Sequence, residues 1–254
     1  GVLLETSVEA AEAVHAVFRV GGTLAPLDGR LAPAELAERI EAAGVDHLVC
    51  SSGTAETARK ATGDLPVRPL SIDPVDGVTT VDAREPAELP LPAWSATDRM
   101  VVAFTSGTTG TPKAVALTAG NLSASVVASA FRLGVVPGDR WLLALPIHHM
   151  GGLAPVLRSA VYGTAVVVQE GFDPGRLARA TREHDATGVS LVPTMLRRVL
   201  DADADLSESL RFVLLGGAAA PPELIERCEQ RSVPVYPTYG TTETASQVAT
   251  ATPR

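Results

Sequence analysis

Short apolar runs alternate with amphipathic stretches along most of the chain. Beyond Arg99, runs rich in Val and Leu predict strands, and the periodic stretches between them predict helices. The strands are expected at 100–105, 141–145, 164–168, 187–191, 211–215 and 233–238, and the helices at 119–132, 152–162, 174–184, 194–201 and 221–231. Strands that are apolar throughout must be covered on both faces. The alternation therefore predicts an α/β fold with parallel-rich sheets flanked by helices on both faces.

The first 98 residues follow a looser pattern. A capping box at Thr6–Glu9 starts one helix, and Pro33 and Gly44 mark the start and the end of a second. Proline and aspartate are frequent in residues 63–98, which indicates connecting and edge structure. Strands are predicted at 1–4 and 45–50. We therefore predict two α/β parts, residues 1–98 with a proline-rich connector and residues 99–254.

Composition excludes several classes of protein. The 254 residues include 21 basic and 29 acidic side chains, a net charge of −8, so neither nucleic acid nor an anionic membrane is an expected partner. No run of about 18 apolar residues occurs, so no membrane span is expected. The two cysteines, Cys50 and Cys228, show no metal-ligand spacing, and no signal-peptide pattern opens the chain. These features favour a reduced, cytoplasmic setting.

One loop concentrates phosphate-binding chemistry. Residues 105–113 read Thr-Ser-Gly-Thr-Thr-Gly-Thr-Pro-Lys, directly after a predicted strand. Glycine lets backbone N–H groups approach a phosphate closely, hydroxyls donate to its oxygens, and lysine neutralises its charge. A Walker A loop is excluded because Pro112 precedes the lysine and Ala114 replaces the hydroxyl that would bind magnesium. The residues expected to hold phosphate are Thr105, Ser106, Gly107, Thr108, Thr109, Gly110 and Lys113.

The loop resembles the phosphate-binding signature [ST]-S-G-[ST]-T-G-x-P-K of the adenylate-forming acyl-CoA synthetases at every defined position. Segments similar to the family's other elements follow in its order, at 145–152, 192–194, 214–218 and 239–243. The resemblance implies the large N-terminal domain of that fold, with ATP, Mg²⁺ and coenzyme A as a co-substrate. It also implies an acid–thiol ligase that forms acyl-AMP. Because each segment follows a predicted strand, all are expected at one edge of a single sheet.

The resemblance also implies a role for individual residues. Lys113, Thr242 and Glu243 are expected to be catalytic, with Glu243 as the oxygen ligand of a phosphate-bound Mg²⁺. Tyr239 offers an aromatic face to a purine. The nucleotide is further expected to contact Gly216, Gly217, Ala218 and Gly240.

Five residues are expected around the acid substrate, namely His149, Arg158, Thr241, Ser246 and Gln247. His149 is either a packed core histidine or a wall of the acyl pocket, and His148 is expected to pack. Arg158 interrupts an otherwise apolar helix, so it needs an anionic partner. That partner is either a structural Asp or Glu, or a substrate carboxylate that is not being activated.

Residues 239–247 and the Gly151–Thr164 segment resemble the o-succinylbenzoate–CoA ligases of menaquinone biosynthesis, whose substrate is a dicarboxylate. Other aryl- or fatty-acid–CoA ligases, and a non-catalytic nucleotide-binding protein, stay open as alternatives. A peptide-synthetase adenylation domain is disfavoured because no Asp occurs at 211–217.

Members of the family that this chain resembles are roughly twice as long, and they carry a further catalytic lysine in a small C-terminal domain. The expectation is therefore an incomplete large domain, without the small domain and with impaired turnover. The sequence does not determine the oligomeric state, so a homo-oligomer stays open.

Overall fold

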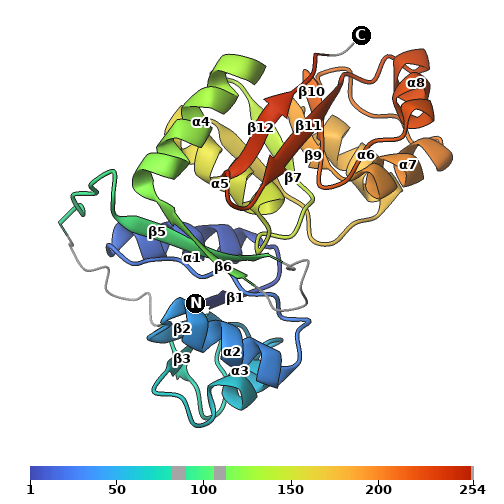
Figure 1. The fold of residues 1–254 in the computed structure, drawn as a ribbon. Helices are drawn as coiled ribbons and strands as arrows, with labels where there is room; N and C mark the ends of the chain where they lie inside the picture. Colours follow the sequence, from blue (N-terminus) through green and yellow to red (C-terminus); the bar gives the residue numbers. More distant parts are fainter. Residues whose placement is uncertain (82–89, 106–112, 253–254) are drawn as a thin grey trace. The chain divides into compact units, whose positions relative to one another are not determined.

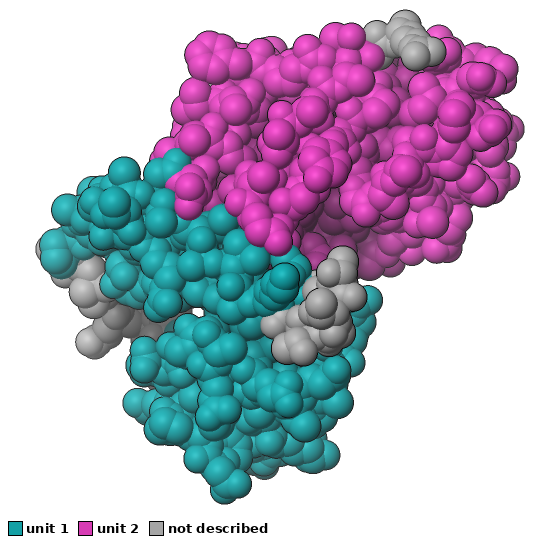
Figure 2. Space-filling model, viewed as in Figure 1, with its two compact units in different colours: residues 1–120 teal, residues 121–254 magenta. Residues whose placement is uncertain are grey.

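The computed structural model describes residues 1–81, 90–105 and 113–252. They belong to two compact units, unit 1 with residues 1–120 and unit 2 with residues 121–254 (Figure 2). The domain division expected between residues 98 and 99 stays a prediction. Among the described residues, no helix combines the length and the apolar character that crossing a membrane requires.

Unit 1 contains a parallel four-stranded sheet in the order β1-β2-β3-β4. Its strands are β1 (Val2–Leu3), β2 (His47–Cys50), β3 (Arg68–Ser71) and β4 (Thr79–Thr80), and its helices are α1 (Val8–Arg19), α2 (Pro33–Ala43) and α3 (Ala55–Thr62). Ser7 caps α1 by accepting a hydrogen bond from the Ala10 N–H at 3.1 Å. Gly44 ends α2 with a φ of 66°, so both predicted helices are confirmed. Helix α3 was not predicted because its buried face consists mainly of alanines, without large apolar side chains.

Two further strands of unit 1 form an antiparallel pair, β5 (Arg99–Thr105) and β6 (Lys113–Thr118). Strand β6 was not predicted, because only Leu117 in it is both large and buried. The phosphate-binding segment therefore connects two antiparallel strands. This corrects the expectation that every functional segment follows a strand of one sheet, since β5 and β6 form a separate two-stranded sheet among the described strands. Strand β5 also makes an isolated parallel bridge from Val101 to Leu24.

Unit 2 contains a six-stranded sheet in the order β12-β11-β10-β9-β7-β8. Its strands are β7 (Arg140–Leu143), β8 (Ala165–Val168), β9 (Gly188–Leu191), β10 (Phe212–Leu215), β11 (Val235–Thr241) and β12 (Ser246–Thr250). All neighbours are parallel except β11 and β12. The predicted parallel-rich sheet is confirmed, and β12 is an addition that the sequence pattern did not indicate.

Helices cover both faces of this sheet (Figure 1). They are α4 (Ala119–Leu133), α5 (Met150–Tyr162), α6 (Pro174–Glu183), α7 (Pro193–Asp201) and α8 (Pro222–Gln230). Alternate residues of β10 point to opposite faces. Val213 and Leu215 join the core formed with α6, α7 and α8, whereas Phe212 and Leu214 join Trp141 beside α4 and α5. The predicted helices and the α/β class are confirmed.

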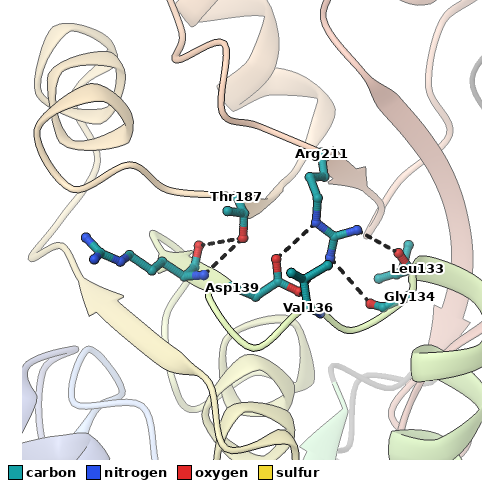
Figure 3. A network of polar contacts seen from close by, with 7 residues as sticks. Leu133, Gly134, Val136, Asp139, Thr187 and Arg211 are labelled. Carbon is teal, nitrogen blue, oxygen red and sulfur yellow. Dashed lines mark hydrogen bonds and ion pairs between the residues drawn. The ribbon is translucent and has the colours of Figure 1, made fainter.

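A polar network joins α4 to the beginnings of β7 and β10 (Figure 3). Arg211 donates to the Asp139 carboxylate through Nε at 3.0 Å and Nη2 at 2.6 Å, and to the Leu133 carbonyl through Nη1 at 3.2 Å. The Val136 N–H donates to the same carboxylate at 2.8 Å. Burial alone would raise the pKa of Asp139, but these hydrogen bonds outweigh it and hold that pKa below its ordinary value.

Each unit also contains one free cysteine, Cys50 in unit 1 and Cys228 in unit 2. Both residues are fully buried. Burial raises the pKa of the Cys50 thiol, and it raises the pKa of the Cys228 thiol to about 11. Both side chains therefore remain neutral thiols at physiological pH.

Candidate functional site

Four segments of unit 2 meet at one edge of its sheet. Strands β11, β10, β9 and β7 are parallel neighbours, so their carboxyl ends lie at the same edge. The segments that follow these strands contain His149, Val192, Gly216 and Thr242. The shared edge expected from the sequence is thus confirmed for the segments of unit 2.

The described ends of the phosphate-binding segment lie in unit 1. Thr105 and Lys113 pair across β5 and β6, with Thr105 half-buried and Lys113 exposed. The pairing places a hydroxyl-bearing and an ammonium-bearing residue opposite each other at the base of this segment. The remaining predicted phosphate-binding residues, Ser106, Gly107, Thr108, Thr109 and Gly110, lie outside the described residues.

The turn between β10 and α8 presents backbone rather than side chains. Gly216 lies so close to Thr238 that a Cβ would stand 2.7 Å from its Cγ2 atom, and Gly217 has a φ of 79°. Gly217 and Ala218 are exposed. A segment without bulky side chains leaves room for a flat ligand to approach the backbone.

Tyr239, Gly240 and Thr241 belong to β11 rather than to a loop after it. Strand β11 is longer than predicted because it pairs with β12, with Tyr239 opposite Ala249 and Thr241 opposite Ser246. The side chain of Tyr239 is 67% exposed, so its ring is accessible to a ligand.

Thr242 and Glu243 occupy the turn that joins β11 to β12, which we call the 242–245 turn. The Thr244 hydroxyl accepts a hydrogen bond from the Thr241 N–H at 3.0 Å. A Cβ on Gly240 would lie 2.0 Å from the Ser246 carbonyl oxygen, so only glycine fits there. The turn is therefore held closed from within, with the exposed Glu243 side chain on it.

The segment after β7 places His149 at the start of α5. His149 is the N-cap residue of that helix and is exposed, so it is not a packed core histidine. The half-buried His148 ring packs edge-on against it, with the centroids 4.3 Å apart. Gly152 is required here, because a Cβ would stand 2.2 Å from the Pro146 carbonyl oxygen.

Arg158 is the largest fully buried side chain of the described residues, with 1% exposed. Its guanidinium carbon lies 5.7 Å from the Trp141 ring centroid. Burial lowers the pKa of Arg158 to about 10, although Tyr162 acts in the opposite direction. No described carboxylate pairs with it, and its Nε and Nη2 atoms have no hydrogen-bond partner. The expected structural Asp or Glu is therefore not found, and two N–H groups still require an acceptor.

Polar side chains link α4 to both α5 and β12. The Tyr162 hydroxyl donates to the Val126 carbonyl at 2.5 Å, and the Ser129 hydroxyl lies 3.4 Å from Gln247 Oε1. The Gln247 Nε2 atom donates to the Thr250 hydroxyl at 3.1 Å. Gln247, expected beside the substrate, is thus half-buried and hydrogen-bonded at both ends of its amide.

The cavity in this region is small. Its volume is about 20 Å³, and its walls include Ser129, Trp141, Tyr162 and Phe212. A space of that size holds about one water molecule. The Trp141 and Phe212 rings pack edge to face in its wall, with their centroids 4.8 Å apart.

Comparison with known proteins identifies the family. The chain matches the family described as AMP-binding enzyme over residues 1–254. The chain belongs to the AMP-binding enzyme family. The 2-succinylbenzoate–CoA ligase of Bacillus licheniformis is 36% identical to it over 252 residues, which cover 99% of this chain and 51% of that protein.

Solved structures agree with this AMP-binding assignment. The o-succinylbenzoate coenzyme A synthetase of Bacillus subtilis in complex with its acyl-adenylate intermediate gives a TM-score of 0.89 at 34% identity, over 99% of this chain and 50% of that one. The same enzyme in complex with ATP and magnesium gives 0.88 at 34% identity, over 99% and 51%. The chain therefore spans about half the length of the relatives it matches, and the family resemblance stated from the sequence is confirmed.

The donor groups of this AMP-binding chain fit a metal that is bound mainly through phosphate. Among the described residues, no group of three or more His, Cys, Asp or Glu side chains is placed to hold a metal ion. Glu243 offers a hard carboxylate beside the Thr242 hydroxyl. Mg²⁺ commonly takes one or two protein carboxylates and completes its shell with phosphate oxygens and water.

Sequence reasoning did not single out three side chains near the shared sheet edge and the small cavity of unit 2. These are Ser125, Trp141 and Thr244. Ser125 and Ser129 stand four residues apart on α4, which places both on one face of the helix and was a readable signal. The pattern gave no comparable signal for Thr244, whose contacts depend on the closure of the 242–245 turn.

Proposed function

We propose that this chain provides the nucleotide- and acid-binding part of an ATP-dependent acid–CoA ligase that activates o-succinylbenzoate. The observation that carries the proposal is Arg158, which is buried, unpaired by any described carboxylate, and short of two hydrogen-bond acceptors. o-Succinylbenzoate carries two carboxylates. One reacts, and the other supplies the anionic oxygens that a buried guanidinium requires.

In the proposed reaction, the substrate carboxylate attacks the α-phosphorus of ATP, acyl-AMP forms and pyrophosphate leaves. The thiol of coenzyme A then displaces AMP. Both reactants of the first step are anionic, so binding, alignment and charge neutralisation dominate the catalytic task. The Mg²⁺ ion supplies part of that neutralisation when bound.

The proposal gives each of the candidate site residues a role. Lys113 and Thr105, with the five residues that follow Thr105, hold the departing pyrophosphate. Thr242 and Glu243 hold the magnesium-bound phosphate, and Tyr239 contacts the adenine together with Gly216, Gly217, Ala218 and Gly240. His149, Thr241 and Ser246 line the acid-binding region, whereas Gln247 acts through its hydrogen bonds to α4 and β12. A cytoplasmic location is part of the same proposal.

The second carboxylate distinguishes o-succinylbenzoate from the alternative substrates, a fatty acid or another aryl acid. A monocarboxylic acid would leave Arg158 without an anionic partner once its only carboxylate reacts. The cavity of about 20 Å³ beside α4 and α5 does not discriminate between these acids, because it holds about one water molecule and is smaller than any of them.

The direct test compares two non-hydrolysable sulfamoyl mimics of the acyl-adenylate, one succinylbenzoyl and one benzoyl. Calorimetric titration of Arg158→Met should show about 100-fold weaker binding of the succinylbenzoyl mimic, since a charge-assisted hydrogen bond contributes about 1.5–3 kcal/mol. Binding of the benzoyl mimic should change by less than about threefold. An equal loss for both mimics contradicts the role of Arg158, and no binding of either mimic to the unaltered chain contradicts the proposed function.

A second test uses the two lysines of the chain as a matched pair. Lys113→Met should weaken pyrophosphate binding at least about tenfold, because it removes a cation beside the bound anion. Lys60→Met is the control, since Lys60 is exposed and pairs with Glu56 on α3. Equal affinities of the two variants would contradict a role of Lys113 in phosphate binding.

A further inference from the structure

We infer that Ser125 of α4 is a positioning residue for Glu243, and that its hydroxyl sets the metal affinity of the nucleotide site. The inference rests on the proposed role of Glu243 as a magnesium ligand. It concerns a helix residue that makes no contact with nucleotide in the proposal. Its basis is the strained backbone that follows Glu243.

Two consecutive residues that follow Glu243 in the chain have positive φ angles, although neither is a glycine. Ala245 has a φ of 53° and Ser246 a φ of 105°. Such conformations are unfavourable for residues with a Cβ, and they persist only where surrounding contacts impose them. The strain therefore needs a source of restraint, and it lies only two residues from the proposed metal ligand.

The restraint comes from both sides of the strained pair. Inside the 242–245 turn, Thr244 bonds the backbone of Thr241. Outside it, the Ser125 hydroxyl donates to the Ala245 carbonyl at 2.7 Å, across 120 positions of sequence. Ala245 itself is 3% exposed, so its carbonyl has little access to water as a substitute donor. The Ser125 hydroxyl is thus the external contact that holds Ala245 in its left-handed conformation.

Loss of this hydroxyl has a specific consequence. The Ala245 carbonyl would be left without its donor, and the backbone could relax toward an ordinary negative φ. The relaxation would displace Glu243, which lies two residues earlier in the same turn. Mg²⁺ requires nearly ideal octahedral geometry. Binding that includes the metal should therefore suffer more than binding of the nucleotide alone.

The experiment measures ATP binding to the 254-residue chain by calorimetry, with Mg²⁺ and with EDTA. Ser125→Ala should weaken binding of MgATP about tenfold, the lower end of the range for groups that orient metal ligands. Binding of ATP in EDTA should change less than about twofold. Ser125→Thr keeps the hydroxyl and should restore MgATP affinity. Ser123→Ala, an exposed serine on the same helix, is the matched control and should bind like the unaltered chain.

A double-mutant cycle tests the route through Ala245. Glycine adopts a positive φ without the Cβ penalty, so Ala245→Gly makes the turn less dependent on Ser125. In that background, Ser125→Ala should weaken MgATP binding by less than about threefold, and the two effects should be non-additive. Full additivity would overturn the route through the strained residue.

The possible failures are distinguishable. Equal losses with Mg²⁺ and with EDTA, or no loss in a folded Ser125→Ala variant, overturn the positioning role while leaving the proposed function intact. Metal-independent ATP binding by the unaltered chain overturns the role of Glu243 itself. Thermal unfolding of each variant verifies that it is folded, and Ser125→Cys, with a weak donor of similar size, replaces any alanine variant that is not.

Discussion

Two arginines of unit 2 contact the same aromatic pair and differ in nearly every other respect. Arg158 lies 5.7 Å from the Trp141 ring centroid, and Arg211 lies 5.6 Å from that of Phe212. The Arg211 side chain is 32% exposed and is bound by both oxygens of Asp139. Arg158 is 1% exposed, and two of its nitrogen atoms have no partner.

The difference separates stability from function. A buried polar network that is fully hydrogen-bonded rigidifies a fold, whereas one that is partly satisfied costs free energy. Burial lowers the pKa of Arg158 from its ordinary value to about 10, which corresponds to a cost of about 3 kcal/mol. Arg211 stabilises the start of the sheet, and Arg158 carries a cost that a substrate carboxylate would offset in the proposed complex.

The largest expected effect comes from breaking the satisfied network. Asp139→Leu should lower the free energy of unfolding of unit 2 by about 3 kcal/mol, because it leaves a partly buried guanidinium without its carboxylate. Urea unfolding followed by Trp141 fluorescence measures this, in a Trp94→Phe background so that one tryptophan reports.

The control for that experiment is an exposed ion pair. Glu56→Leu removes the carboxylate beside Arg59 and Lys60, both exposed on α3, and should lower the free energy of unfolding far less than Asp139→Leu does, because solvent screens exposed ion pairs. Because Glu56 lies in unit 1, unfolding of this variant is followed by the fluorescence of Trp94, which lies in the same unit. Similar costs for the two substitutions would show that the Arg211 network contributes no more than an exposed ion pair.

A smaller effect of opposite sign is expected at Arg158. Arg158→Met should raise the free energy of unfolding by about 1–2 kcal/mol at pH 7, because an apolar side chain of similar volume removes the burial cost of the charge. The folded state releases the Arg158 proton near pH 10, before the unfolded chain does. The advantage of the variant should therefore shrink as the pH rises above about 10. A destabilised variant at pH 7 would contradict the comparison of the two arginines.

The smallest expected effect is the acid response of Asp139. Its folded-state pKa lies below the ordinary value of 3.8, so its contribution is complete above that pH and is lost as the pH falls through the folded-state pKa. Thermal unfolding of the unaltered chain and of Asp139→Asn between pH 6 and pH 3 should show a gap of about 1 kcal/mol that narrows below pH 4. A gap independent of pH would mean that the carboxylate charge contributes nothing.

The sequence predicted the elements whose signals are local. Two such signals are the helix caps at Ser7 and Gly44 and the long Val- and Leu-rich runs, which depend only on neighbouring residues in the sequence. The structure contains these elements as expected. Strand β12 was missed because its pairing partner, β11, determines its conformation. Helix α3 was missed because alanine buries too little area to give a periodic signal.

The candidate site divides in the same way. The signature residues could be identified because glycine, threonine and lysine in one loop are typical of phosphate binding. The sequence also marked Arg158 as unusual, yet whether it had a carboxylate partner depended on neighbours far along the chain. The bond from Ser125 to Ala245 joins a common helix residue to a backbone carbonyl. The spacing of Ser125 and Ser129 on one helix face could be read from the sequence, but the backbone acceptor at Ala245 could not.

The two buried cysteines allow the rate of structural opening to be measured for each unit separately. A thiol reagent reaches Cys50 or Cys228 only when the surrounding structure opens, since both are fully buried and hold their protons tightly. Because one belongs to each unit, peptide-resolved rates of alkylation would time the opening of unit 1 and of unit 2 within the same molecule. No label, tag or substitution is needed for that measurement.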